Sequence, residues 1–225
     1  VFNEENTIGE VLERVSKADT LGLRKEIVVV DDASTDRTLA RVQEFSKKTP
    51  IKIVCHSYNK GKGAALCSGF SEANGDLILV QDADLEYSPS DYKKLLEPLL
   101  KGQADVVYGS RFLASKRRRG YPTHYIANRI FTTLSNILSR ERLSDAETCY
   151  KVFKKSVLDS ISLKENRFGF DLEFTAKISR VPNIHVIEVP VSYHPRSYAE
   201  GKKIGIKDGF RALYCVFRYN LFGRK

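Results

Sequence analysis

The sequence predicts an α/β fold: a mostly parallel sheet flanked by helices, followed by a helical and basic C-terminal extension. Four short apolar runs alternate with helical patterns up to residue 112. Short connections join them, as parallel strands with right-handed crossovers require. After residue 115 the helical segments lengthen and positive charge accumulates. We find no internal repeat and no linker, so the 225 residues are expected to form a single domain, 1–225.

The elements of the first half follow from periodicity and from caps. Residues 7–20 repeat apolar side chains at Ile8, Val11, Leu12 and Val15, which is a helical stripe. Residues 26–32 are a β-branched run, typical of a strand buried on both faces. Further along we expect helix 35–49 capped by Ser34, strand 51–57, helix 63–73, strand 76–82, a helix from Ser90 to about Lys101, and strand 104–112.

The second half is predicted to be richer in helix. Residues 116–120 are expected to form a loop, 122–140 and 145–160 helices, 183–193 a strand, and 167–174 part of the core. Residues 203–222 combine basic residues with apolar ones at helical spacing, namely Phe210, Leu213, Tyr214, Phe217 and Leu221. This pattern predicts a helix that lies on an anionic membrane surface or packs its apolar face on the sheet.

Charge is divided unevenly along the chain. Residues 1–110 hold 14 basic and 18 acidic side chains, a net −4, whereas residues 111–225 hold 23 and 10, a net +13. The first half is therefore suited to metal ions and the second to an anion or an anionic surface. The four cysteines form no CxxC pair, so we expect reduced thiols in a cytoplasmic protein.

Two further features concern membranes and the chain start. No apolar run reaches the roughly 18 residues of a membrane-spanning helix, and no basic-then-apolar leader opens the sequence. The chain begins at Val1 and contains no Met, so we expect a natural start to precede it.

Acidic side chains gather where two predicted strands end. Asp31 and Asp32 close strand 26–32, and Asp82, Asp84 and Glu86 close or follow strand 76–82. Ligands of parallel sheets bind beyond these strand ends, and converging carboxylates repel one another unless a cation is present. The second group therefore predicts a divalent cation, Mg²⁺ or Mn²⁺, that bridges phosphates. Turn capping is the other interpretation, with most weight at Asp31 and Asp32.

Five motifs carry a resemblance to a known family. FNEENTI, VVVDDASTDRT, NKGKGAA, VQDADLEY and GSRF, in that order, resemble the family 2 glycosyltransferases of the GT-A fold. Nearly the whole chain is covered, and the branch it most resembles is typified by dolichyl-phosphate (polyprenyl-phosphate) mannose synthases. In that family the opening motif follows a first strand and has Tyr where this chain has Phe2. A strand contributing to the nucleotide pocket is therefore expected before Val1.

The resemblance implies that residues 1–115 bind the nucleotide sugar and the metal. Asp31 matches the residue that holds the base or ribose, and the loop at Lys60 closes over the nucleotide. The implied nucleotide-sugar contacts are Phe2, Asn3, Glu4, Asp31, Asp32, Ser34, Lys60, Gly61 and Asp82. Asp82 and Asp84 match the DxD pair that meets the metal–diphosphate. Glu86 is a third implied metal contact, where related synthases often have Gln.

Residues 116–225 are implied to bind the acceptor. Arg111, at the end of strand 104–112, matches the arginine that receives an acceptor phosphate, and Asp84 and Arg111 are the expected catalytic residues. Arg129, Arg196 and Lys202 are implied as further acceptor-phosphate contacts. A solvated surface charge is the other interpretation of Arg129 and Lys202.

These residues imply an inverting, metal-dependent transfer of a hexose from GDP-mannose or UDP-glucose to a polyprenyl or dolichyl phosphate. The cation stabilises the leaving diphosphate. A phosphate acceptor is already ionised and needs positioning rather than a base, whereas a hydroxyl acceptor would require Asp145 or Glu147 as the base. We expect the protein at the cytoplasmic side of a membrane, either peripheral or anchored by segments outside this sequence.

There are three alternatives to this reaction. In the first, the same donor site serves an acceptor hydroxyl of a polysaccharide or a protein-linked glycan. A nucleic-acid-binding protein is suggested by the net charge of +9 and by KRRR at 116–119. It is disfavoured because no DNA- or RNA-binding motif is present and the strand-end carboxylates repel phosphates, so no nucleic-acid partner is expected. A dinucleotide-dependent oxidoreductase lacks its G-x-G-x-x-G motif.

Overall fold

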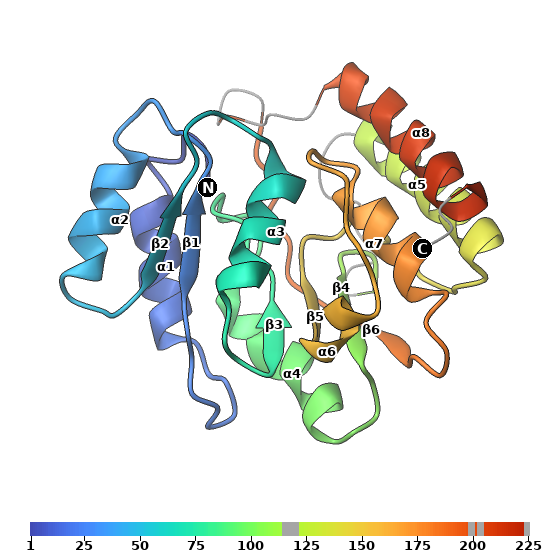
Figure 1. Cartoon of the computed structure of the whole chain (residues 1–225), viewed down its shortest axis with the longest axis horizontal. Helices are drawn as coiled ribbons and strands as arrows, with labels where there is room; N and C mark the ends of the chain where they lie inside the picture. The colour runs from blue at the N-terminus through green and yellow to red at the C-terminus, as the bar shows by residue number, and fades with distance from the viewer. Residues whose placement is uncertain (114–121, 198–200, 202–204, 223–225) are drawn as a thin grey trace.

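The computed structural model describes residues 1–113, 122–197, 201 and 205–222, and Figure 1 shows their arrangement. The N-terminal part contains α1 (Ile8–Lys17), β1 (Val28–Asp31), α2 (Thr38–Ser46) and β2 (Lys52–Cys55). Strands β1 and β2 pair in parallel from Val28–Lys52 to Asp31–Cys55. The β-branched run is confirmed in β1, where Val28, Val29 and Val30 precede Asp31.

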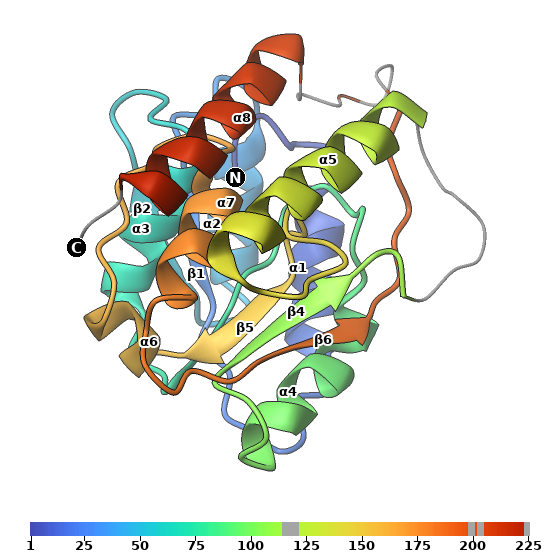
Figure 2. The same ribbon diagram turned by 90° about the vertical axis from the view of Figure 1, so that its right-hand side faces the viewer.

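A second sheet occupies the middle of the molecule, with the strand order β3–β5–β4–β6. Its members are β3 (Leu77–Leu79), β4 (Val106–Ser110), β5 (Lys151–Lys154) and β6 (Val186–Pro190). Strand β6 runs parallel to β4, whereas β5 is antiparallel to both β3 and β4. Figure 2 shows β4, β5 and β6 side by side beneath two long helices.

Helices cover both sheets. They are α3 (Lys62–Glu72), α4 (Tyr92–Leu100) after the 3₁₀ turn η1 (Pro89–Asp91), α5 (Pro122–Ser139), α6 (Ser156–Asp159), α7 (Phe170–Ile178) and α8 (Ile206–Leu221). Helices α5, α7 and α8 lie together over the second sheet (Figure 2). The predicted fold class is confirmed, but β5 lies antiparallel between β3 and β4, so the four strands of the first half do not form one continuous parallel sheet.

An apolar cleft separates β1 from β3. Its walls come from both strands and from α1, α3 and α4. The backbone of Val1 extends along the β1 edge that faces this cleft: its N–H donates to the Val30 carbonyl at 2.6 Å and its carbonyl accepts from the Asp32 N–H at 2.9 Å. These two bonds hold the opening loop at the carboxyl end of β1.

The predicted helix 145–160 is wrong. Only the short α6 is helical there, and residues 151–154 form strand β5. Tyr150, Lys151, Val152 and Phe153 are all fully buried, because α7 covers one face of the sheet and α4 the other. Lys151 is neutralised by an ion pair with Asp171. A central strand is normally predicted from a continuous apolar run. The buried Lys151 interrupts that run in β5, so the strand is not evident from the sequence.

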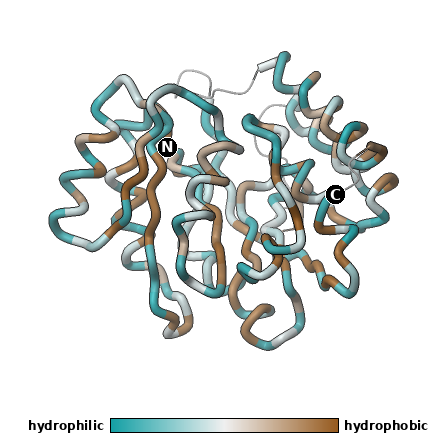
Figure 3. Tube along the Cα trace, in the orientation of Figure 1, coloured by the Kyte–Doolittle hydropathy of each residue, from teal (hydrophilic) through white to brown (hydrophobic). Residues whose placement is uncertain are grey.

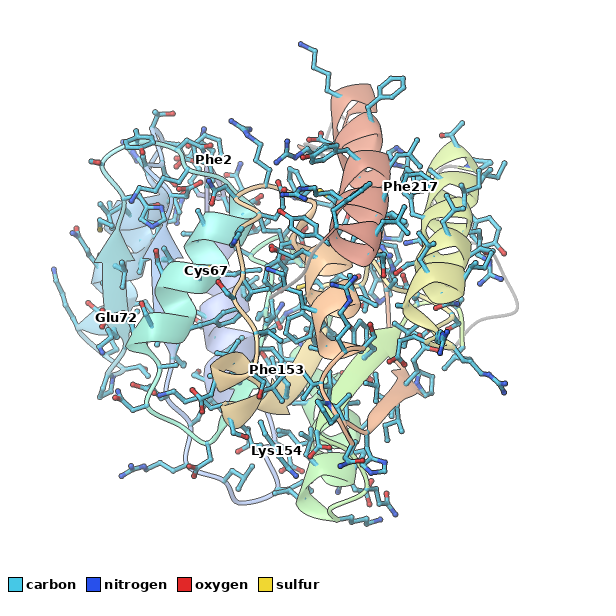
Figure 4. The ribbon with its side chains drawn as sticks, turned by 45° about the vertical axis from the view of Figure 1, so that its right-hand side comes forward. Phe2, Cys67, Glu72, Phe153, Lys154 and Phe217 are labelled. Carbon is cyan, nitrogen blue, oxygen red and sulfur yellow. The ribbon has the colours of Figure 1, made fainter. Side chains whose placement is uncertain are left out.

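Residues 167–174, predicted as core, contribute to α7. This helix is buried on all sides apart from its last turn, so its sequence lacks the apolar stripe of a surface helix. Phe170 and Phe174 stack at 5.8 Å between ring centroids, and Phe174 lies 5.0 Å from Phe153. Figure 4 shows Phe153 in the interior of the molecule.

Helix α8 confirms the helix predicted over 203–222. It packs on α7 and α5, and Figure 3 shows hydrophobic and hydrophilic turns alternating along it. Among the residues described by the structure, no helix combines the length and the apolar composition needed to cross a bilayer.

Candidate active site

The opening loop is tied to the turn that follows β1. The backbone N–H of Asn3 donates to Ser34 Oγ at 3.0 Å, and Asn3 Oδ1 accepts from the Thr35 N–H at 2.8 Å. The Glu4 N–H donates to Thr38 Oγ1 at 2.7 Å. Phe2 lies at one end of the molecule in Figure 4, far from Lys154 at the other. The loop and the turn therefore form one unit at the carboxyl end of β1.

Asp31 and Asp32 have different surroundings in this unit. Asp31 is 3% exposed; its Oδ2 accepts from the Ser34 N–H at 3.1 Å, while its Oδ1 has no hydrogen-bond partner among the described residues. A buried carboxylate oxygen without a partner is costly, and a donor from a ligand would satisfy it. In Asp32, by contrast, both carboxylate oxygens accept hydrogen bonds from the protein.

The Asp32 carboxylate organises the loop that precedes α3. It accepts from the backbone N–H groups of Lys60 and Gly61, each at 2.8 Å, and contacts His56 Nδ1 at 2.6 Å. Gly61 has a φ of 101°, a conformation that side chains rarely adopt. Residues 60–63, which we call the donor loop after the role that the resemblance implies, are thereby fixed beside the end of β1. His56 showed no pattern in the sequence, because its partner is 24 positions away.

The acidic turn after β3 is held by cations from elsewhere in the chain. Lys62 Nζ lies 2.9 Å from Asp82 Oδ2. Burial raises the pKa of Asp82, but the charge and the hydrogen bond of Lys62 outweigh burial and leave that pKa lowered. Burial and the charges of Asp82 and Glu86 raise the pKa of Asp84 to about 7. The sequence displayed Lys62 in NKGKGAA, but nothing in the motif indicated that its side chain neutralises Asp82.

Arg196 reaches this turn from the segment that follows β6. Its guanidinium binds both Glu4 oxygens, at 2.9 and 3.2 Å, and lies 3.3 Å from Asp84 Oδ2. Glu86 is engaged by the same segment, since it accepts from Tyr193 Oη at 2.9 Å and from the Arg196 N–H at 2.8 Å. Arg196 thus joins the opening loop at Glu4 to the acidic turn at Asp84 and Glu86, which are distant from each other in the sequence.

Arg111 follows β4 and forms a bidentate ion pair. Its Nε and Nη2 each lie 2.7 Å from the carboxylate of Asp145, which also accepts from Asn128. Burial raises the pKa of Asp145, but the Arg111 charge and hydrogen bonds outweigh it and leave that pKa lowered. The guanidinium also lies 5.2 Å from the Tyr193 ring centroid. Arg111 is therefore oriented from two sides.

The cleft between β1 and β3 is part of a larger cavity, and most of the predicted site residues line this cavity. Its lining includes Phe2, Glu4, Asp32, Gly61, Asp82, Asp84, Glu86, Arg111 and Arg196. Asn3, Asp31, Ser34 and Lys60 lie beside it in the two loops described above and are not part of its wall. Arg129 is exposed on α5, where its Nη1 donates to the Ser144 carbonyl at 3.1 Å. Lys202 lies outside the described residues.

Two acidic residues in the cavity wall were not assigned to it from sequence. Asp171, paired with Lys151, and Glu147 both line it. Burial, with the charges of Asp171 and Asp145, outweighs the attraction of Arg111 and raises the pKa of Glu147 to about 7. From the sequence, Glu147 is expected only as a base for a hydroxyl acceptor, because its half-buried position beside Arg111, Asp145 and Asp171 depends on the tertiary structure.

The carboxylates of the 82–86 turn are the candidate metal ligands. Within residues 1–113, 122–197, 201 and 205–222, no three His, Cys, Asp or Glu side chains converge as a ready-made metal cage. Asp82 and Asp84 nevertheless offer oxygen ligands at the cavity wall. Such a pair fits Mg²⁺ or Mn²⁺ in sites where substrate phosphates complete the coordination shell.

Comparison with known proteins identifies the family. Residues 1–162 match the family model described as Glycosyl transferase family 2. The chain belongs to this family. The predicted resemblance is thereby confirmed, and the chain carries a glycosyltransferase domain.

Named relatives share the branch predicted from the motifs. A dolichol-phosphate mannosyltransferase of Pyrococcus furiosus is 32% identical over 96% of this chain, and a dodecaprenyl-phosphate galacturonate synthase of Rhizobium johnstonii is 28% identical over 100% of it. This chain spans 61% and 65% of the length of these two family members, respectively.

Solved structures support the fold. A glucosyl-3-phosphoglycerate synthase from Mycobacterium tuberculosis, in complex with Mn²⁺, uridine-diphosphate and phosphoglyceric acid, superposes with a TM-score of 0.74 at 20% identity. The match covers 98% of this glycosyltransferase chain and 76% of that structure. The GT-A fold expected from the motifs is confirmed.

The raised pKa of Glu147 predicts a pH-dependent stability. The folded protein holds the Glu147 proton more tightly than the unfolded chain does, so stability falls as the pH rises from about 4.5 to about 7. The wild type should lose about 1–3 kcal/mol of its free energy of unfolding between pH 5 and pH 8, and Glu147→Gln should not show this loss. Urea unfolding at both pH values measures it.

Glu44→Gln, at an exposed position of α2, is the matched control and should behave like the wild type at both pH values. An equal stability difference for Glu147→Gln at pH 5 and pH 8 would contradict the assignment of a raised pKa.

Proposed function

We propose that this chain is the catalytic domain of an inverting, metal-dependent transferase that moves a hexose from a nucleotide sugar to a polyprenyl or dolichyl phosphate. One observation supports this most directly. The carboxylates of the 82–86 turn and the guanidinium groups of Arg111 and Arg196 line the same cavity. The two halves, 1–115 and 116–225, would then serve donor and acceptor within a single domain.

The donor is proposed to bind at the carboxyl end of β1. The buried Asp31 Oδ1 suits a ribose hydroxyl or a base N–H. Phe2, Asn3, Glu4 and Ser34 are proposed as further donor contacts, because the opening loop is bonded to the turn at Ser34. Lys60 and Gly61 are held over this end of β1 by Asp32. GDP-mannose and UDP-glucose are the two donors proposed.

Asp82 and Asp84 are the residues proposed to hold Mg²⁺ or Mn²⁺, together with diphosphate oxygens, and Glu86 is the third. A divalent cation there would stabilise the negative charge that develops on the leaving diphosphate. Glu86 is held in place by Tyr193 and by the Arg196 N–H. Mn²⁺ accompanies uridine-diphosphate in the M. tuberculosis synthase, which supports a divalent requirement.

The acceptor phosphate is proposed to bind Arg111 and Arg196. Asp145 takes the Nε–Nη2 edge of Arg111, which leaves the Nη1 edge to meet an acceptor oxygen. Arg196 would exchange Glu4 and Asp84 for the acceptor phosphate once the donor is bound. Arg129 and Lys202 remain proposed contacts at the rim. The relatives whose names specify lipid-phosphate products or substrates support this acceptor.

The central test is transfer from GDP-mannose or UDP-glucose to a short-chain polyprenyl phosphate with Mn²⁺ or Mg²⁺. We expect turnover that excess chelator abolishes, and a kcat at least about a hundredfold lower for Asp84→Ala, since several kcal/mol of charge stabilisation is lost. Product is measured as radiolabelled sugar extracted with the lipid.

Asp76→Ala, exposed just before β3, is the matched control and should retain wild-type kcat. Undiminished turnover in chelator or in Asp84→Ala would refute the metal assignment, and no transfer from either donor would refute the proposed reaction.

A hydroxyl acceptor is the second candidate, and Glu147 favours it. This carboxyl lines the cavity together with Asp84 and Arg111, and its pKa of about 7 suits a general base. A polysaccharide or a protein-linked glycan could supply such a hydroxyl. A phosphate acceptor would not use a base.

The acceptor class is distinguished by two variants. For a phosphate acceptor, Arg111→Lys should raise the acceptor KM about tenfold while the donor KM stays constant, because Lys replaces a planar fork with a point charge. Glu147→Gln should retain kcat within about threefold, since no proton is removed. Steady-state kinetics with each substrate varied measures both.

Lys also keeps a cation beside Asp145, which avoids leaving that carboxylate buried and unpaired. Arg142→Lys, at an exposed position after α5, is the control. A large loss of kcat in Glu147→Gln with little effect of Arg111→Lys would favour the hydroxyl acceptor instead.

The anionic, cytoplasmic leaflet of a membrane is the proposed partner of α8 and α5. Their outer faces expose large apolar side chains: Ile126, Ile130 and Ile137 on α5, and Phe210, Tyr214, Phe217 and Leu221 on α8. Lys207 and Arg218 add positive charge along α8. An apolar face bordered by basic residues suits binding to anionic lipid, and the α5–α8 pair also borders the cavity.

We expect the protein to sediment with vesicles of phosphatidylcholine and phosphatidylglycerol, and to do so less with phosphatidylcholine alone. Replacing Phe210 and Phe217 together by Ser should weaken binding at least about tenfold, since two large side chains each contribute more than 1 kcal/mol. Leu100→Ser, exposed at the end of α4, is the control. Equal binding by all three proteins would exclude this face.

A further inference from the structure

Residues 163–167 lie between the donor loop and α8. On the donor side the contact joins backbone to backbone: the Ala64 N–H donates to the Asn166 carbonyl at 3.1 Å. A Cβ added at Gly61 would lie less than 3.0 Å from the Asn166 carbonyl oxygen, and one at Gly63 equally close to that of Glu165. No side chain separates the segment from the donor loop, so a displacement of one is transmitted to the other.

On the opposite side the segment is bound to α8 through Glu165. This side chain is 2% exposed and accepts from Arg211 Nη2 at 2.7 Å and from Arg211 Nε at 3.1 Å. Cys215 Sγ lies 3.3 Å and Tyr219 Oη 3.5 Å from the same carboxylate. The three partners are spaced four residues apart, so they form one stripe on the side of α8 that faces Glu165.

Glu165 is ionised in this setting. Burial raises its pKa, but the hydrogen bonds from Arg211 and Cys215 outweigh burial and leave the pKa lowered. The same carboxylate, together with burial, raises the pKa of the Cys215 thiol to about 12, so this thiol stays protonated. A buried carboxylate with a bidentate arginine is a strong and directional contact.

The segment has a second support that does not involve α8. Glu173 of α7 accepts from the backbone N–H groups of Lys164 and Glu165. The chain can therefore remain folded when the contact with α8 is weakened. What the Arg211 contact adds is the position of the segment against the donor loop.

We propose that Glu165 is a positioning residue of the nucleotide-sugar site. By binding Arg211, Cys215 and Tyr219 it fixes residues 163–167 to α8, and this segment in turn holds the donor loop against the end of β1. The proposal rests on the proposed function, because the donor loop is the part of that site which closes over the nucleotide. Neither Glu165 nor Arg211 touches the turn that is proposed to hold the metal.

Weakening this contact should affect donor affinity more than the chemical step. Asp32 would still bind the Lys60 and Gly61 N–H groups, so the donor loop would stay folded but occupy its closed position less of the time. A site that is competent for only part of the time binds its ligand more weakly in proportion. Once the nucleotide is bound, Asp84 and Arg111 are unchanged, and so is kcat.

The test is nucleotide affinity by titration calorimetry, with UDP and GDP as probes in the presence of Mn²⁺. Arg211→Ala should bind nucleotide about five- to tenfold more weakly than the wild type. Arg211→Lys, which keeps one charge-assisted bond, should be intermediate. Arg218→Ala removes the same charge from an exposed position of the same helix and should bind like the wild type. In steady-state kinetics the donor KM should rise, with kcat and acceptor KM within about twofold.

Hydrogen exchange gives a readout that does not depend on a nucleotide. The amides of residues 60–66 should exchange faster in Arg211→Ala, and in the near-isosteric Glu165→Gln, than in Arg218→Ala. If the wild type bound neither UDP nor GDP, the proposed function would fail and this measurement alone would decide the link. Unchanged exchange at 60–66 in both variants, or equal losses of kcat and of affinity for both substrates, would overturn the proposal.

Discussion

The carboxylate of Asp32 is the contact on which the rest of the site depends. It is buried at the end of β1, and it satisfies the N–H groups of Lys60 and Gly61 together with His56. These bonds join the end of the strand to the start of α3. Because a buried carboxylate must be paired, the donor loop cannot leave Asp32 without exposing an uncompensated charge. The loop is thus held beside the end of β1, where the proposed function places the nucleotide.

The unequal charge of the two halves has its physical meaning in the cavity. Two carboxylates of the first half, Glu4 and Asp84, form ion pairs with Arg196 of the second half. Arg111 is oriented by its ion pair with Asp145. Several of the groups that the proposed chemistry requires are therefore held by an opposite charge in this structure. Such pairs orient the groups and can exchange partners when charged substrates arrive.

Local patterns were sufficient where an element has one buried face and one exposed face. Helix α1 and helix α8 follow their apolar stripes. The prediction was wrong at β5, and at 167–174 it identified the core but not helix α7. Both elements are buried. There Lys151 and Asp171 interrupt the apolar pattern, and they are tolerated because they pair with each other across 20 positions.

By itself, the sequence determined the fold class, the family and several of the charged residues that line the cavity, because short motifs at strand ends are characteristic of the family. Tertiary structure alone decided which charges pair: His56 with Asp32, Lys62 with Asp82, Arg196 with Glu4, and Arg211 with Glu165. The reason is physical. An ion pair depends on distance in space, and the partners of these pairs stand between 20 and 192 positions apart in the chain.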